Sequence, residues 1–512
     1  MTVSAYKTIK NSFYSRKIRA GLQRLEASPA GSRLVKGALW SLGGSIISRG
    51  LMMAAWVIVA RILGKETYGE FGIIRSTVNM FTVFAGFGLG LTATKYIAEF
   101  RDSDPQRAGR VMALSGVFAA ISGGFIALGL IIFAPWLAQA SLNAPHLANP
   151  LRIGALMLFL AAMNGAQIGA LAGFEAFKAI AVVNSIAGVL AFPLYLFGAM
   201  WGGINGAIWA YAINLFILWA LSHVALRKAA YQNRVLFSYR NCWLEWSVLW
   251  RYSLPAVLSG VMVSPVKWIC DALLVNQQGG YGQMGIYSAT IIFQTTLLFV
   301  SSAISNPLLA MLSNAKGNIS ENLARLNILI SWSIGILISL PLLCFPEIAQ
   351  ILFGKSYIDP QFHRAMPIVI FVTCLIMYKE GLARLLATHS LMWWGFLSNA
   401  VWALFLIGSS YFLVHFGATG LAASYAIAYI ANIAIILPFY IRKNLTPVST
   451  LFSNETGIVW AILIILTILP FINCPLFLRM VLFIISLTIF LLVLNRLAKP
   501  YSKERAIKTS II

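Results

Sequence analysis

Long apolar runs follow one another along almost the whole chain, and this repetition constrains the fold more than any other feature. Of the 512 residues, 59% are hydrophobic and only 10% are charged. Only helices and closed barrels satisfy their backbone groups inside a bilayer, and a helix of about 20 apolar residues crosses the hydrocarbon core. The runs therefore predict an all-α polytopic membrane protein with about fourteen transmembrane helices.

The predicted spans share this length and apolar character, and short polar or basic segments separate them. The closing pair is divided only by the turn between Pro470 and Pro475. The spans lie near residues 37–63, 71–98, 111–134, 151–173, 179–199, 204–226, 252–275, 285–312, 324–345, 365–388, 393–415, 418–441, 457–473 and 476–495.

The positive charge of the chain falls on alternate loops. The formal net charge is +23, and basic residues gather before the first span, near 101–110, 227–240 and 442–443, and after the last span. Several of the loops between them, such as 135–150 and 276–284, contain no Lys or Arg, whereas the one near 346–364 holds a few charges. Because positively charged loops stay in the cytoplasm, both termini are predicted to be cytoplasmic. This distribution does not predict a nucleic-acid partner.

The first 36 residues lack the apolar core of a cleavable signal peptide.

The sequence contains no pattern typical of an enzyme or a metal site. The five cysteines show neither disulfide nor metal spacing. Asp102-Ser103-Asp104 resembles the metal-binding pair of sugar-nucleotide transferases, but Pro105 follows it, which favours a helix cap. We therefore expect no enzymatic activity, no cofactor and no metal.

Two stretches of the sequence are repeated at nearly one offset. Tyr68-Gly69-Glu70-Phe71-Gly72-Ile73 opens the second span, and Tyr281-Gly282-Gln283-Met284-Gly285-Ile286 opens the eighth. Tyr211-Ala212-Ile213 likewise matches Tyr425-Ala426-Ile427. Six spans separate the copies, so both copies have the same orientation. The repeat predicts two parallel six-helix lobes followed by two appended helices, a plan that recurs among transporters with a site between the lobes.

The predicted organisation follows from this repeat. In the segment that joins the lobes, Trp and Leu side chains alternate with Arg234, Arg240 and Arg251, as in a helix lying on anionic lipid. We interpret it as an interfacial linker rather than a binding site. The parts are a basic cytoplasmic tail (1–36), the N-lobe (37–226), the cytoplasmic amphipathic linker (227–251), the C-lobe (252–441), the last two spans (442–495) and a second basic cytoplasmic tail (496–512).

Basic side chains inside the spans outnumber acids. Arg49, Arg75, Lys267 and Lys379 lie deepest, and each costs roughly 2.5 to 3.5 kcal/mol near a helix centre. Two acids cannot neutralise them all, so these four cations are predicted to bind an anionic substrate in a hydrated cavity. Arg61, Lys95 and Arg384 lie near helix ends, where they are expected to snorkel to the interface.

The two acids inside the spans, Asp271 and Glu380, are candidates for ion coupling. Asp271 follows Lys267 by four residues, and a pair between these two side chains is the alternative. Pro255 and Pro265 bend the seventh span, because proline removes a backbone hydrogen bond. A bent span lining a cavity is a candidate gate, and an ordinary packing kink is the alternative interpretation.

Several short motifs resemble a known family. They lie at 36–41 (KGALWS), 60–64 (ARILG), 68–69 (YG) and 95–99 (KYIAE), with Phe353-Gly354 and Tyr357 before the tenth span. In these motifs the chain resembles the polysaccharide transport family, the O-antigen flippases of Wzx type, in the multidrug/oligosaccharidyl-lipid/polysaccharide exporter superfamily.

The resemblance implies a V-shaped, two-lobed bundle in a bacterial inner membrane that moves a polyprenyl-diphosphate-linked oligosaccharide between leaflets by alternating access. The expected partners are this substrate and membrane lipids, with a polysaccharide polymerase as a candidate protein partner, and the protein is expected to act as a monomer. The alternatives are a multidrug exporter of the same superfamily and a membrane-embedded polymerase or glycosyltransferase. Buried acids are expected in exporters of cationic drugs, and the charge balance here is the reverse.

Overall fold

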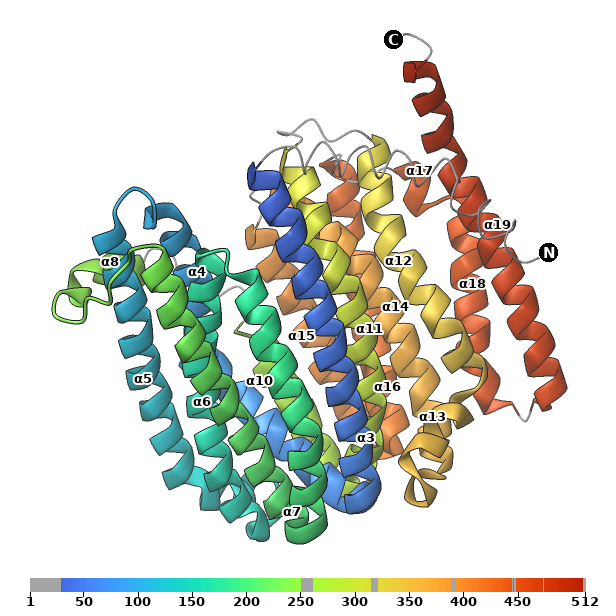
Figure 1. Ribbon diagram of the computed structural model, residues 1–512. Coiled ribbons are helices and arrows are strands. Elements are labelled where there is room, and N and C mark those ends of the chain that lie inside the picture. Colours follow the sequence, from blue (N-terminus) through green and yellow to red (C-terminus); the bar gives the residue numbers. More distant parts are fainter. Residues whose placement is uncertain are drawn as a thin grey trace, which may run out of the picture.

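The computed structural model describes residues 29–249, 261–314, 321–388, 392–443, 445, 448–472 and 474–509. Within them the chain forms α-helices and short 3-10 or π turns, and these residues contain no strand. Ten described segments are long and apolar enough to cross a membrane. These observations confirm the predicted all-α polytopic fold (Figure 1).

Two of the longest helices fold back on themselves at a glycine. Helix α3 (Pro29–Gly86) has a non-helical residue at Gly64 with φ 73°, and α7 (Phe177–Gln232) has one at Gly203 with φ 53°. Positive φ is readily adopted only by glycine. Asn214 on the second half of α7 donates to the carbonyl of Ala187 on the first half, at 2.8 Å. The two halves therefore lie side by side, and the helix is a hairpin.

A third hairpin is formed by α15 (Met392–Leu413) and α16 (Gly417–Arg442), which meet at Gly417 with φ 71°. Asn432 donates to the Ser398 carbonyl across this hairpin at 2.6 Å. Each hairpin thus provides two crossings from a segment of 50 to 56 residues.

The second predicted span is not one continuous helix. Phe87 and Gly88 both have positive φ, 41° and 63°, and they separate the end of α3 from α4 (Leu89–Phe100). The prediction of one uninterrupted span over 71–98 is therefore wrong. Beyond this break, α4 packs closely on α6 (Ala148–Gly173), because a Cβ at Gly169 would overlap the Gly90 carbonyl.

The remaining elements complete two bundles and a terminal pair. The N-lobe adds α5 (Pro105–Trp136), η1 (Leu137–Ser141), η2 (Pro145–Leu147) and α6 (Ala148–Gly173) to α3, α4 and α7, and η3 (Cys242–Glu245) and α8 (Trp246–Val248) belong to the linker. The C-lobe comprises α10 (Val263–Val275), α11 (Gly280–Asn314), α12 (Glu321–Cys344), α13 (Pro346–Phe353), η5 (Lys355–Tyr357), α14 (Pro360–Thr388), α15, η6 (Val414–Phe416) and α16. After α17 (Val448–Leu451), the chain ends with α18 (Asn454–Ile468), η7 (Leu469–Phe471) and α19 (Leu476–Thr509).

In Figure 1 the N-lobe helices α4 to α7 form one bundle and the C-lobe helices another, with α3 between them and α18 and α19 at the far edge. Helix α3 has extensive contacts with both α7 and α11, so it joins the two bundles. The count of fourteen spans stays a prediction, because the start of the seventh span falls in 250–260, outside the described residues. The exact lobe boundaries also stay predictions.

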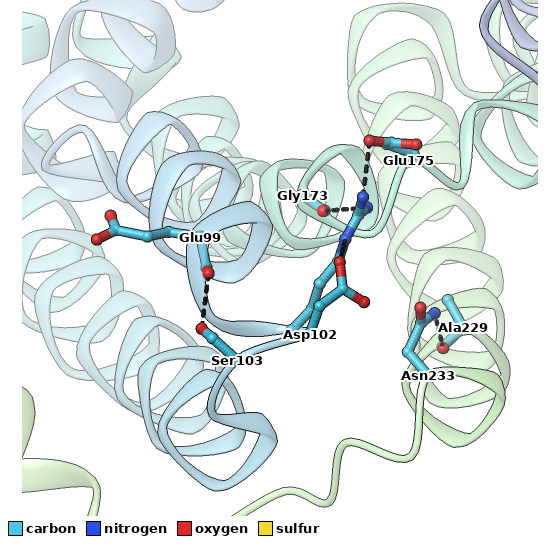
Figure 2. A network of polar contacts seen from close by, with 8 residues as sticks. Glu99, Asp102, Ser103, Gly173, Glu175, Ala229 and Asn233 are labelled. Atoms are coloured by element: carbon cyan, nitrogen blue, oxygen red, sulfur yellow. Dashed lines mark hydrogen bonds and ion pairs between the residues drawn. The ribbon is translucent and has the colours of Figure 1, made fainter. Parts of the chain in front are cut away.

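The basic segments lie at one end of the bundle, which we call the basic end (top of Figure 1). The loop after α4, the linker near α8 and the last turns of α19 are all found there. Arg101 crosslinks two loops at this end, because its Nη2 lies 2.7 Å from Oε1 of Glu175 and its Nη1 donates to the Gly173 carbonyl at 3.1 Å (Figure 2). Asp104 accepts a hydrogen bond from the Arg107 amide at 3.0 Å, which confirms that this acid is a helix cap.

Thiol labelling tests whether the basic end faces the cytoplasm. A membrane-impermeant thiol reagent applied to intact cells is expected to label Gln278→Cys and not Lys443→Cys, because the two residues are exposed at opposite ends and positively charged loops remain inside. The parent protein, with its native cysteines, sets the background. Labelling of Lys443→Cys alone would invert the predicted topology.

Candidate functional site

Arg75 lies on the second half of α3, against aromatic rings. Its guanidinium carbon is 4.3 Å from the centroid of the Trp56 ring and 6.0 Å from that of Tyr211. Its Nε is buried and has no hydrogen-bond partner among the described residues. A guanidinium stacked on an aromatic face still presents N–H donors along its edge. The Arg75 guanidinium therefore lies against aromatic rings and forms no ion pair with a carboxylate of the described residues.

Two hairpins assemble the rings around Arg75. Trp56 stacks on Tyr195 with 4.7 Å between centroids and meets Tyr211 edge-on at 5.5 Å. Trp56 belongs to α3 and the two tyrosines belong to α7, on either side of its turn at Gly203. The reversals in both helices are thus required to build this aromatic cluster.

Asp271 on α10 is held by the N-lobe rather than by Lys267. Its Oδ2 accepts a hydrogen bond of 2.6 Å from the Ser76 hydroxyl. Its Oδ1 is buried and has no partner within the described part of the chain. No ion pair joins Asp271 to Lys267 in the described residues, so the alternative of a pair one helical turn apart does not hold in this conformation. The acid lies where the two lobes meet.

Lys267 is exposed, although α10 packs against α3 and α15. Its neighbour Trp268 donates through Nε1 to the Thr77 hydroxyl of α3 at 2.9 Å. Since Thr77 is two residues after Arg75, the helices that carry Arg75 and Lys267 are in direct contact. The structure therefore brings these two predicted cations to adjoining helices of different lobes.

Lys379 and Glu380 lie within the C-lobe. The Lys379 ammonium is 5.7 Å from the centroid of the Tyr429 ring. Glu380 accepts a hydrogen bond of 2.9 Å from the Ser301 hydroxyl of α11. Of the two predicted coupling acids, only Asp271 bonds across the lobes in the contacts of the described residues.

Arg49 reaches the other lobe near the middle of the first span. It is exposed, and its guanidinium carbon is 5.3 Å from the centroid of the Phe299 ring on α11. None of the four predicted substrate-binding cations, Arg49, Arg75, Lys267 and Lys379, takes part in an ion pair within the described residues.

The three cations expected to snorkel differ in their exposure. Arg61 and Lys95 are exposed. Arg384 is only 6% exposed, and its Nε donates to the Asn327 side-chain oxygen at 2.6 Å. Snorkelling is thus the wrong prediction for Arg384, because a polar side chain of α12 is close enough to satisfy it inside the bundle.

The candidate gate is described only in part. Pro265 lies in the first turn of α10, which begins at Val263. A proline there loses no helical hydrogen bond. Pro255 lies outside the described residues, so a bend of the seventh span at that position stays a prediction.

At the end opposite the basic end, polar contacts join the lobes. Lys65 and Asp359 form an ion pair of 2.8 Å. Asn276 donates to the Ser141 carbonyl at 2.7 Å, and the Tyr281 hydroxyl donates to the Leu142 carbonyl at 2.8 Å. The lobes are therefore closed against each other at this end.

The two copies of the sequence repeat pack against each other in this closed region. A Cβ at Gly69 would overlap the Tyr281 carbonyl oxygen, and one at Gly285 would overlap the Lys65 carbonyl oxygen. Small residues at these positions let the backbones of α3 and α11 touch. The sequence revealed the repeat but not this contact. The two copies open corresponding spans of the two lobes, so they lie at the same end of the bundle, where they can meet.

Sequence reasoning also missed the uncharged partners of the predicted residues. They are the hydroxyls of Ser76 and Ser301 and the rings of Trp56, Tyr211, Phe299 and Tyr429. In the described part of the chain, no group of three His, Cys, Asp or Glu side chains is placed to hold a metal ion.

Comparisons with known proteins agree with this architecture. The EPS I polysaccharide export inner membrane protein EpsE of Ralstonia nicotianae is 22% identical over 422 residues, covering 79% of this chain and 94% of that protein. The lipid III flippase of Escherichia coli is 25% identical over 287 residues, covering 55% and 67%. The lipid II flippase MurJ in an inward closed conformation superimposes with a TM-score of 0.67 at 14% identity, covering 90% of this chain and 99% of that one.

The family is decided by a match over more than half of the chain. The family model described as polysaccharide biosynthesis protein matches residues 34–313. That range takes in the whole predicted N-lobe, the linker and the start of the C-lobe. The match confirms the resemblance seen in the short motifs, and the chain belongs to the polysaccharide biosynthesis protein family.

Proposed function

We propose that the protein is a flippase that moves a polyprenyl-diphosphate-linked oligosaccharide, an O-antigen or related repeat unit, from the cytoplasmic to the outer leaflet of a bacterial inner membrane. One observation carries the proposal: both lobes supply deep cations, and these make no ion pair within the described residues. The names of the export and flippase relatives support the same class of activity.

A diphosphate suits the chemistry of these cations. Arg75 can offer a fork of N–H donors, and Lys267 a compact point charge on the adjoining helix of the other lobe. Arg49 and Lys379 would extend the cationic lining along the path of the sugar. The lipid tail would remain in the bilayer while the headgroup moves between the lobes.

Alternating access would require the closed end to open. The ion pair between Lys65 and Asp359 and the hydrogen bond from Ser76 to Asp271 both cross the lobes. In an outward-open state these contacts would break while the lobes approach at the basic end. The closed end would then face the outer side of the membrane, in keeping with the positive charge at the other end.

Asp271 is the better placed of the two candidate coupling acids, because it bonds across the lobes and keeps one carboxylate oxygen without a partner in the described residues. We expect Asp271→Asn to remove the dependence of flipping on an imposed proton or sodium gradient. Glu380→Gln is the matched control and should retain that dependence. Gradient-driven flipping that survives both substitutions would show that neither acid carries the coupling ion.

A reconstituted transport assay tests the function itself. The full chain in proteoliposomes is expected to translocate a labelled polyprenyl-diphosphate-linked oligosaccharide, with no new glycosidic bond in the product. Export of a cationic dye without movement of the lipid-linked sugar would instead establish a multidrug exporter. Elongated sugar chains would establish a polymerase or glycosyltransferase. Light scattering of the purified protein measures its mass and is expected to give that of a monomer. Binding of a purified polysaccharide polymerase to the same protein tests that candidate partner.

A further inference from the structure

The linker lies directly on helix α5, and its only acid is neutralised there. Glu245 is 5% exposed, and its two carboxylate oxygens accept hydrogen bonds of 3.0 Å from Arg107 and Arg110. A Cβ at Gly109 of α5 would overlap the Leu236 carbonyl oxygen. Backbone contact and buried charge therefore fix the linker over residues 233–249 to the N-lobe.

The outer surface of this region is basic and apolar. Leu236 is 77% exposed and Leu244 is 74% exposed. A surface that mixes exposed cations with large apolar side chains is typical of a segment in the headgroup layer of an anionic membrane. The exposed cations are Arg227, Lys228, Arg234 and Arg240.

A cavity of about 240 Å³ lies beneath the linker, between α5, α6 and α7. Its walls include Gly116 and Val117 of α5, and Phe237 and Tyr239 of the linker cover it. Its lining is mostly apolar. An apolar cavity of about 150 Å³ holds a benzene ring, so this one has room for several methylene groups.

Two exposed cations are next in sequence to residues that line the cavity. Arg227 follows the lining residue Leu226, and Arg240 follows the lining residue Tyr239. Arg227 is also near enough to His223, another lining residue, to interact with it electrostatically. An apolar cavity with cations next to its lining residues matches a molecule that has an anionic headgroup and a hydrocarbon chain.

We propose that this cavity binds an anionic phospholipid of the cytoplasmic leaflet, with one acyl chain beneath Phe237 and the phosphate on Arg227 and Arg240. None of the four cations assigned to the transported substrate lines it. The proposal therefore stands apart from the flippase function, and lipid binding there requires neither the transported substrate nor an ion gradient.

Photo-crosslinking of the full chain in vesicles tests the site. Phosphatidylglycerol with a diazirine in its acyl chain is expected to label the peptides that contain residues 112–120 and 223–240 about tenfold more than the matching phosphatidylcholine. Arg227→Gln with Arg240→Gln should abolish that preference. Arg442→Gln with Lys443→Gln, an exposed basic pair at the end of α16, is the control and should preserve it.

A second pair of variants tests the apolar part of the site. A Cβ at Gly116 or at Gly129 meets no atom within 4 Å, and only Gly116 lines the cavity. Gly116→Leu should therefore fill the cavity and reduce labelling from the acyl chain about tenfold, the effect of about two methylene groups no longer buried, while Gly129→Leu should not. Equal labelling in Gly116→Leu and wild type, or a phosphatidylglycerol preference that survives loss of both arginines, would overturn the proposal. Displacement of the label by a polyprenyl phosphate but not by phosphatidylglycerol would also overturn it.

Discussion

Arg75→Ala is expected to lower translocation of the lipid-linked oligosaccharide by about 10- to 100-fold at matched protein abundance. A hydrogen bond to a charged group contributes about 1.5 to 3 kcal/mol, and each 1.4 kcal/mol corresponds to about tenfold in affinity. Arg75→Lys should restore part of the activity, because it keeps the positive charge while losing the flat contact with Trp56. Transport in proteoliposomes of equal protein content measures both effects.

The matched control for this substitution is Arg152→Ala. Arg152 is an exposed arginine on α6 whose guanidinium bonds only to Asn149 in the contacts of the described residues, so its removal should leave transport intact. A purely structural role for Arg75 predicts a different outcome. Since a buried charge is costly in a membrane, Arg75→Ala would then insert as well as wild type or better and transport normally. That result would remove Arg75 from the substrate site.

Gly285→Val is expected to open the closed end of the lobes and to stop transport. Its side chain would overlap the Lys65 carbonyl oxygen, and overpacking of a tight contact costs about 1 to 3 kcal/mol. That cost lowers the population of the closed state by about 5- to 150-fold relative to the open one. A crosslink made by a bifunctional thiol reagent between Lys65→Cys and Asp359→Cys, which replace an ion pair of 2.8 Å, reports on closure and should disappear.

Gly282→Ala is the control for this effect. A Cβ at Gly282 would lie 3.5 Å from the Glu66 side chain, at ordinary contact distance, so the crosslink and transport should both persist. An undiminished crosslink in Gly285→Val would mean that the contact between the repeats does not hold the end closed. Loss of the crosslink with full transport would mean that closure is not part of the cycle.

The apolar runs predicted the helical spans well, because bilayer thickness fixes how long such runs must be. Periodicity could not reveal where a span is interrupted. Phe87 adopts positive φ, a conformation that a residue of this type rarely takes outside a special tertiary context. The reversals at Gly64 and Gly203 lie between predicted spans, where loops were expected. Only one non-helical residue interrupts α3 and α7 at these positions.

The cations of the candidate site were visible in the sequence because charged side chains are rare inside membrane-spanning helices. Their partners were not visible. Spacing along one helix suggested a pair between Lys267 and Asp271, but the partner of Asp271 is Ser76 on another helix. Arg384 likewise is satisfied by Asn327 of a neighbouring helix. A single sequence contains the periodicity of each helix but not the rotation of one helix against the next, and that rotation decides which side chains meet.

Direct binding of the diphosphate tests the central claim most sharply. A short-chain, water-soluble polyprenyl-diphosphate-linked sugar and its monophosphate counterpart would be titrated by calorimetry into the purified full chain and into Arg75→Gln with Lys267→Gln. The two cations are expected to give the wild type at least about tenfold tighter binding of the diphosphate than of the monophosphate, and the double variant should lose this preference. An equal preference for the diphosphate in the double variant and the wild type would contradict the claim that cations from both lobes bind the substrate.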